Sequence, residues 1–229
     1  MLPPKASADF VWAMEEVLEV YARPYDPRRP VVGCDEASKQ LLADVRPPLP
    51  PAPGQPQRVD YEYERHGTGN LFMVFEPLSG KRHVEVTARR TKADFARLLR
   101  RVADEWYPEA ELITLVVDNL NTHRPAVLYE VFEPAEARRL LGRLEFVYTP
   151  KHASWLNVAE LELSVLARQC LGRRIPDLEA LRREVRAWEQ ERNAAVVKVD
   201  WQFTTADARV KLKRLYPILE TVKSAEMDH

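Results

Sequence analysis

The segment that most restricts the fold is the run Leu112-Ile113-Thr114-Leu115-Val116-Val117, which is almost entirely apolar, rich in β-branched side chains and ends at Asp118. Polar residues would alternate with apolar ones if one face of this strand met water. The run is therefore typical of a central strand that is covered on both faces, as in a sheet with helices on either side. With 229 residues, 45% of them hydrophobic, the chain is long enough to bury such a core.

Other apolar segments predict further strands. Val31 to Cys34 is interpreted as a short buried strand ending at Asp35-Glu36, and alternation or β-branched composition predicts strands over residues 59–64, 71–75, 83–86 and 144–148. Glycine-containing segments predict turns at residues 67–70 and 78–81. The early strands form an antiparallel meander in this interpretation, and the later ones extend it into a mixed sheet.

Apolar residues at helical spacing predict the helices. One of them begins after Thr91, with Asp94 completing a weak capping box, and another begins at Ser154 and ends near Leu171. The remaining helices are expected over residues 10–22, over 125–141 with a break near Pro134, after Asp177, and over 206–215. The fold class predicted from this order is α/β, a mixed sheet with an antiparallel meander and parallel strands, flanked by helices.

Composition divides the chain into three parts. Residues 1–30 hold a helix and a proline-rich linker, residues 31–176 form the α/β domain, and residues 177–229 form a C-terminal helical extension. Within the α/β domain, residues 46–57 contain six prolines and are predicted to be an exposed polyproline-like loop.

Charge and hydropathy limit the classes of function. The net charge of -1 argues mildly against DNA binding, but residues 164–216 carry twelve Lys and Arg against seven Asp and Glu, enough for a basic face. No apolar run is long enough to cross a membrane, and the N-terminus lacks a hydrophobic signal core, so we expect a cytoplasmic protein with no membrane partner. Cys34 and Cys170 do not have metal-site spacing and are interpreted as buried free thiols.

Three carboxylates lie at the ends of predicted elements. Asp35 follows the first strand, Asp118 follows the most buried strand, and Glu160 lies in the first turns of a helix. If the two strands are neighbours, Asp35 and Asp118 emerge at the same end of the sheet, where open α/β sheets place ligands. Converging carboxylates repel one another, and a divalent cation relieves that cost. All-oxygen ligands suit Mg²⁺ or Mn²⁺, and two such ions support phosphodiester cleavage and strand transfer.

Three segments resemble the motifs of DDE transposases. Val116 to His123 resembles the second-aspartate motif, Thr149 to Glu160 resembles the third-carboxylate motif, and Cys34-Asp35-Glu36 matches the first-aspartate position. The similarity covers residues 31 to 217 and is greatest to the IS-six-thirty type of bacterial insertion-sequence transposase within the mariner-like superfamily. One departure from the family is the long spacing of 41 residues between Asp118 and Glu160, with the excess assigned to residues 134–141.

The resemblance implies a ribonuclease H-like fold, with residues 31–176 as a DDE catalytic domain that uses two Mg²⁺ or Mn²⁺ ions held by Asp35, Asp118 and Glu160. It also implies DNA cleavage and strand transfer during transposition and integration, on terminal inverted repeats and target DNA, by a homodimer assembled on DNA and associated with the bacterial nucleoid. A helix-turn-helix region that reads the repeats is expected from an upstream reading frame or a separate chain. The alternatives are another ribonuclease H-like nuclease, and an inactive or partial transposon remnant.

One choice among the candidate site residues is between Glu160 and Glu162. We expect Glu160 to be the third carboxylate, because it directly follows the Leu156-Asn157 element, and Glu162 to be a solvated helix residue. Neighbouring residues are weaker candidates for DNA contacts through phosphate binding or base stacking: Asn119, His123, Lys151, His152, Trp155, Arg168, Arg173 and Arg174. Each also has an ordinary structural role, as a turn residue, an exposed charge or a packing anchor.

Overall fold

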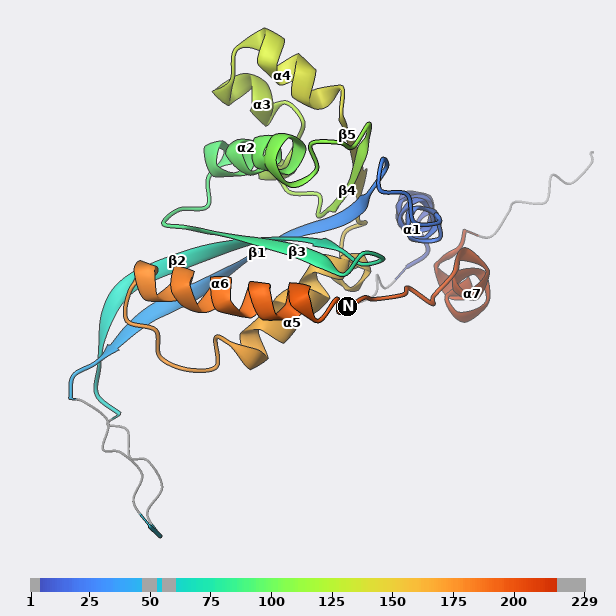
Figure 1. The fold of residues 1–229 in the computed structure, drawn as a ribbon. Coiled ribbons are helices and arrows are strands. Elements are labelled where there is room, and N and C mark those ends of the chain that lie inside the picture. The colour runs from blue at the N-terminus through green and yellow to red at the C-terminus, as the bar shows by residue number, and fades with distance from the viewer. Residues whose placement is uncertain (1–4, 47–52, 55–60, 218–229) are drawn as a thin grey trace, which may run out of the picture.

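A computed structural model describes residues 5–46, 53–54 and 61–217. Within these residues, five strands form one sheet in the order β3-β2-β1-β4-β5 (Figure 1). Strand β2 pairs antiparallel with both β1 and β3, whereas β4 pairs parallel with both β1 and β5. The predicted mixed sheet is thereby confirmed, with these strand bounds: β1 Val31–Asp44, β2 Tyr63–Glu76, β3 Lys81–Thr87, β4 Ile113–Val117 and β5 Leu144–Tyr148.

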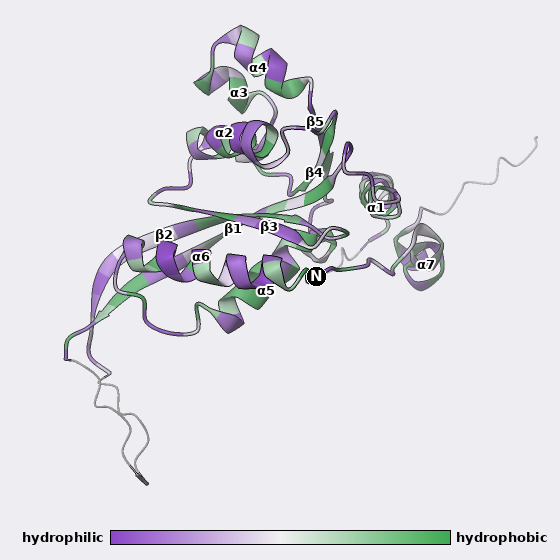
Figure 2. Ribbon diagram, in the orientation of Figure 1, coloured by the Kyte–Doolittle hydropathy of each residue, from purple (hydrophilic) through white to green (hydrophobic). Residues whose placement is uncertain are grey.

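Helices cover both faces of the sheet. On one face lie α2 (Lys92–Arg101), which continues as a π-helical turn over Val102–Trp106, then α3 (Val127–Val131) and α4 (Pro134–Leu141). The other face packs against α1 (Ala8–Tyr21), α5 (Val158–Gln169), α6 (Leu178–Ala194) and α7 (Thr205–Lys211) (Figure 1). Colouring by hydropathy shows apolar residues along β4 and β5, whereas β3 is largely hydrophilic (Figure 2). Each layer encloses its own apolar cluster against the sheet.

Several local predictions are confirmed. All five residues of β4 are buried, as the unbroken apolar run requires. Thr91 and Asp94 form a full capping box at the start of α2, and the Asp177 side chain caps α6 by accepting from the Ala180 N–H. The helical segment 125–141 is broken before Pro134, where α3 ends and α4 begins.

The sequence interpretation of the meander is wrong in two places. Strand β1 does not end at Asp35-Glu36 but continues to Asp44, because residues 33–44 pair with β2 along almost their whole length. The segment 67–70 is not a turn but part of β2. Gly67 has a φ of +91° and lies where the β1–β2 register shifts, so this glycine serves a β-bulge instead.

The predicted helix from Ser154 begins later. Ser154–Leu156 forms a short 3₁₀ turn, and Asn157 caps α5 by accepting a hydrogen bond from the Ala159 N–H. The last predicted helix is found as α7 followed by a 3₁₀ turn over Lys213–Leu215. Most of the proline-rich segment 46–57, and the first part of the strand expected over 59–64, lie outside the described residues.

The N-terminal and C-terminal helices share the core of the central sheet. Met14 and Leu18 of α1 and Leu181 of α6 belong to the same buried cluster as Leu71 and Met73 of β2. This shared core shows no boundary at residue 30 or 176, and the division of the chain at these residues stays a prediction from sequence. None of the helices in the described part of the chain has the length and apolar content needed to cross a bilayer.

Helix α6 also covers the outer edge of the sheet. The backbone N–H of Arg82 in β3 donates to Asn193 Oδ1 at 2.9 Å, and the N–H of Val84 donates to Glu189 Oε2 at 3.1 Å. Both acceptors are side chains of α6, so polar groups that an edge strand normally leaves open are satisfied within the chain.

Candidate active site

Asp35 and Asp118 occupy equivalent positions on neighbouring strands. Strands β1 and β4 pair in parallel with Gly33 opposite Val116, and each aspartate follows its paired residue by two positions. Asp118 is the first residue after β4, while Asp35 lies within the longer β1. The sheet topology therefore brings the two carboxylates to the same region of the sheet, beside the end of β4, as the sequence led us to expect. This region is here called the carboxylate edge.

Strand alternation directs Asp35 toward α5. Its cross-strand partner Met73 packs in the cluster beneath α5 and α6, whereas its neighbour Cys34 packs in the cluster beneath α2. Burial raises the pKa of the Asp35 carboxyl to about 6, and the negative charges of Asp118 and Glu160 add to this rise. The effect of Glu160 indicates that the third carboxylate faces the same region.

Glu160 lies in the first turn of α5. Its Oε2 atom is buried and has no hydrogen-bond partner among the described residues. A buried carboxylate oxygen without a partner is costly, and a bound ion or an ordered water is what satisfies such an atom in native structures.

The start of α5 is attached directly to β1. Asn157 Nδ2 donates to the Cys34 carbonyl at 3.0 Å, one residue before Asp35. A Cβ added at Gly33 would lie 2.6 Å from Val158 Cγ1 and 2.9 Å from the Ala159 nitrogen, so only glycine permits this approach. The element that carries Glu160 is thus packed against the strand that carries Asp35.

The expectation of a solvated Glu162 is wrong. Its side chain is 3% exposed and pairs with Arg82 and Arg192, at 2.9 Å from each. Arg82 is itself fully buried. Glu162 belongs to an ionic cluster that joins α5 to β3 and α6, and this cluster occupies a different side of α5 from Glu160.

Sequence reasoning missed Glu36 as part of this region. Glu36 Oε1 lies 2.9 Å from His123 Nε2, and His123 Nδ1 forms an ion pair with Asp118 Oδ1. Arg90 approaches the other Glu36 oxygen at 3.3 Å. The adjacency of Glu36 to Asp35 was the only sequence indication of this role, and nothing in the sequence revealed the contact with His123.

His123 is not placed to contact DNA, because its side chain has no exposed surface. Burial alone would lower the pKa of the imidazole, but hydrogen bonds to Asp118 and Glu36 outweigh that effect and raise the pKa to about 9. A protonated His123 can donate from both ring nitrogens, one to each carboxylate. His123 therefore orients the Asp118 side chain from the buried side of the site.

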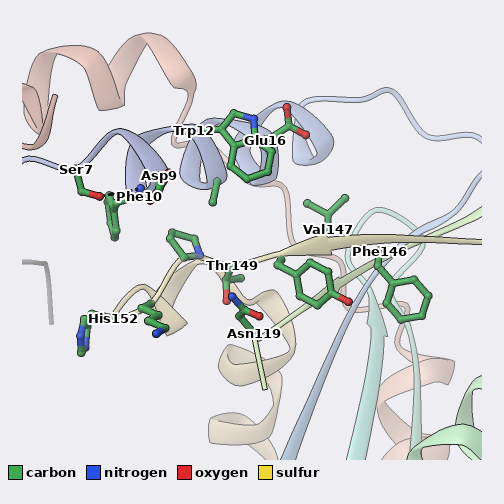
Figure 3. A pocket seen from close by; sticks show the side chains of 14 residues that line it. Ser7, Asp9, Phe10, Trp12, Glu16, Asn119, Phe146, Val147, Thr149 and His152 are labelled. Carbon is green, nitrogen blue, oxygen red and sulfur yellow. Dashed lines mark hydrogen bonds between the residues drawn. The ribbon is translucent and has the colours of Figure 1, made fainter. Parts of the chain in front are cut away.

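A groove of 630 Å³ opens beside the carboxylate edge, between α1 and the loop after β5 (Figure 3). Asn119, Lys151 and His152 line one side of it, and Trp12 lines the other. Lys151 and His152 are exposed, so the structure leaves these two candidates free to meet a phosphate backbone. Trp155 is half-buried and packs its ring edge against Phe203 at 5.8 Å between centroids, which matches the packing role rather than base stacking.

The three candidate arginines lie away from the carboxylates. Arg174 pairs with Asp44 at 2.6 Å, and Asp44 is nine residues along β1 from Asp35, or roughly 30 Å in an extended strand. Arg173 pairs with Glu184 of α6. Arg168 is exposed near the end of α5 and donates to Ser164 Oγ at 3.4 Å.

The donor set suits a hard divalent cation. Among the residues that the structure describes, no three His, Cys, Asp or Glu side chains stand close enough together to hold a metal ion as they lie. Like charges on Asp35, Asp118 and Glu160 oppose such an approach. A bound Mg²⁺ or Mn²⁺ would nevertheless offset the charge repulsion that helps raise the pKa of Asp35, and it would give the Glu160 Oε2 atom a partner. The three carboxylates therefore fit such an ion, because hard divalent cations prefer oxygen ligands.

The sheet order, the helical layers and the carboxylates on adjacent parallel strands define a ribonuclease H-like fold. Residues 30–182 match the family described as DDE superfamily endonuclease, and the chain belongs to this family. No curated protein matches the chain.

Solved structures of one transposase share the fold. The Mos1 mariner paired-end complex with Mn has a TM-score of 0.57 at 14% identity, over 95% of this chain and 66% of that one. The same complex with Mg has a TM-score of 0.55 at 16% identity, over 95% and 66%. The Mos1 paired-end complex with the left transposon end has a TM-score of 0.56 at 15% identity, over 86% and 60%. This chain thus spans less than two thirds of the length of those three.

Proposed function

We propose that this DDE endonuclease domain is the catalytic domain of a transposase, which cleaves DNA at transposon ends and transfers the strand. The observation that carries the proposal is the in-register position of Asp35 and Asp118, with Glu160 entering the same region from α5. The likeness to structures of Mos1 transposase with transposon ends supports DNA as the substrate.

Asp35, Asp118 and Glu160 are proposed to hold two divalent cations. When bound, the two ions activate the attacking oxygen and stabilise the leaving oxygen of a phosphodiester. The chain itself supplies the position of each carboxylate: β1 and β4 fix the two aspartates, and α5 carries Glu160. His123, which is itself bonded to Glu36, holds the Asp118 side chain. Lys151 and His152 are proposed to position the DNA backbone beside them.

The experiment is a cleavage assay on a panel of substrates. Duplexes that end in the inverted repeats flanking the gene are compared with RNA–DNA hybrids and branched DNA, with Mg²⁺ and with EDTA. We expect metal-dependent cleavage of the repeat ends, abolished by Asp118→Asn. Preference for hybrids or branched DNA would favour a different ribonuclease H-like nuclease, and a folded wild type with no cleavage and no cation binding would favour an inactive remnant.

Finer features remain part of the proposal. We propose that the enzyme is of the IS-six-thirty type, acts as a homodimer on paired DNA ends, and works with a helix-turn-helix segment encoded upstream or on a separate chain. Light scattering with and without repeat DNA tests the dimer, since we expect the mass of one chain without DNA and the mass of two chains plus the bound duplexes when DNA ends are present.

A further inference from the structure

The last residue of α1, Tyr21, reaches the loop that leads into α5. Its hydroxyl donates to the Leu156 carbonyl at 2.9 Å and accepts from the Val158 N–H at 3.1 Å. The side chain is buried, and burial raises the pKa of the phenol well above its usual value, so the hydroxyl stays a neutral donor. These two bonds flank Asn157, the residue that caps α5.

Asn157 faces in the other direction, toward β1. While its Oδ1 accepts from the Ala159 N–H at 3.1 Å, its Nδ2 donates to the Cys34 carbonyl. The first turn of α5 is thus held between two anchors, Tyr21 on α1 and Cys34 on β1. Glu160 is three residues after Asn157, and Asp35 is one residue after Cys34.

We propose that Tyr21 and Asn157 are positioning residues, which together fix the carboxylate of Glu160 relative to that of Asp35. This inference rests on the proposed function, because it assumes that the two carboxylates share a cation. Tyr21 lies outside residues 30–182, so the proposal also assigns part of the site to a helix beyond the family match.

The physical reason is the geometric demand of the ion. Mg²⁺ requires nearly ideal octahedral coordination, so a carboxylate displaced by a fraction of an ångström binds it less well. Without the Tyr21 hydroxyl, the Val158 N–H and the Leu156 carbonyl lose a buried partner, and the turn relaxes toward other partners. Glu160, two residues beyond Val158, moves with that turn.

The test is Tyr21→Phe in the full chain, with Tyr216→Phe as the matched control. Tyr216 also bonds α1, through Glu15 Oε1 at 2.7 Å, but is not hydrogen-bonded to the turn before α5. The readouts are Tm, the Mg²⁺ concentration needed for a fixed rise in Tm without DNA, and kcat and KM for repeat-end cleavage. We expect Tyr21→Phe to need about tenfold more Mg²⁺ and to lower kcat with little change in KM, and the control to do neither.

A second variant keeps the inference testable if the Tyr21 variant fails to fold. Asn157→Ser keeps a helix cap but cannot reach Cys34, so it should also raise the Mg²⁺ requirement. Folded variants that match wild type in Mg²⁺ requirement and kcat, while losing only Tm, would overturn the inference and leave the proposed function intact. A wild type with neither a Mg²⁺-induced shift nor cleavage would overturn both.

Discussion

Glu162 Oε1 lies 2.9 Å from Arg82 Nε in the interior of the protein. Glu162 follows Glu160, the carboxylate proposed to bind metal, by two residues. Two glutamates close in sequence therefore have unrelated environments, one ion-paired and one with an oxygen that lacks a partner. Because the environments differ, variants of the two glutamates can distinguish a structural role for Glu162 from a catalytic role for Glu160.

We expect Glu160→Gln to abolish Mg²⁺-dependent cleavage while leaving the free energy of unfolding within about 1 kcal/mol of wild type, as for substitutions that break no buried pair. Glu162→Gln should lower the free energy of unfolding by about 3 kcal/mol, because Arg82 and Arg192 lose the charge that compensates them. Urea unfolding and the cleavage assay, run on both variants, check this. The reverse pattern would assign the third carboxylate to Glu162.

The stability of the metal-free protein should depend on the ionisation of Asp35. Its pKa is raised from 3.8 to about 6 in the folded state, so its contribution to stability is present below pH 4 and is lost as the pH rises through 6. Asp35→Asn removes this loss and should increase the free energy of unfolding at pH 7 by about 3 kcal/mol. Urea titrations between pH 4 and pH 8 measure it, and equal pH profiles for the two proteins would contradict it.

Divalent cations should stabilise the folded chain in the absence of DNA. Binding to the folded state alone adds about 2.7 kcal/mol when the free ion is at 100 times Kd. We therefore expect Mg²⁺ to raise Tm, EDTA to reverse the rise, and Asp118→Asn to remove it. Na⁺ at matched ionic strength is the control, and an equal rise in that variant would argue against a carboxylate site.

The imidazole of His123 should titrate well above an ordinary histidine. A pKa raised to about 9 means that its stabilising contribution is complete below about pH 6.5 and is lost as the pH rises through 9. Glu36→Gln removes one of the two carboxylates and should lower this pKa. NMR titration of the His123 resonances follows both proteins. An unchanged pKa in the variant would exclude the proposed coupling.

Lys151 and Arg173 should differ in their effect on DNA binding. Lys151 is exposed beside the carboxylate edge, whereas Arg173 is paired with Glu184 on α6. Each lost phosphate contact reduces the slope of log K against log salt by about 1. Lys151→Gln should show that reduction and Arg173→Gln should not, as measured by fluorescence anisotropy with repeat-end duplexes from 50 to 200 mM salt.

Sequence reasoning predicted what depends on local pattern. The unbroken apolar run fixed β4 as buried, and the strand-end positions of Asp35 and Asp118 predicted that the two would meet if β1 and β4 were neighbours. The capping pattern at Thr91 and Asp177 located the starts of α2 and α6. In each case the information lies within a few residues of the feature.

Features that depend on distant partners were not predictable in the same way. The second half of β1 is partly exposed and its polar and apolar residues do not alternate, so only its pairing with β2 identifies it as a strand. Glu162 was expected in solvent because its partner Arg82 is 80 residues away, and the contact between His123 and Glu36 spans 87 residues. A single sequence does not encode such contacts in any local spacing.

The α6 side chains that satisfy the outer edge of β3 bear on how the protein can be shortened. A chain cut at residue 182, where the family match ends, would lose Glu189 and Asn193 and leave β3 as an open template for strands of other molecules. Such a fragment should self-associate at concentrations where the whole chain stays dispersed, even with all three proposed ligands still present.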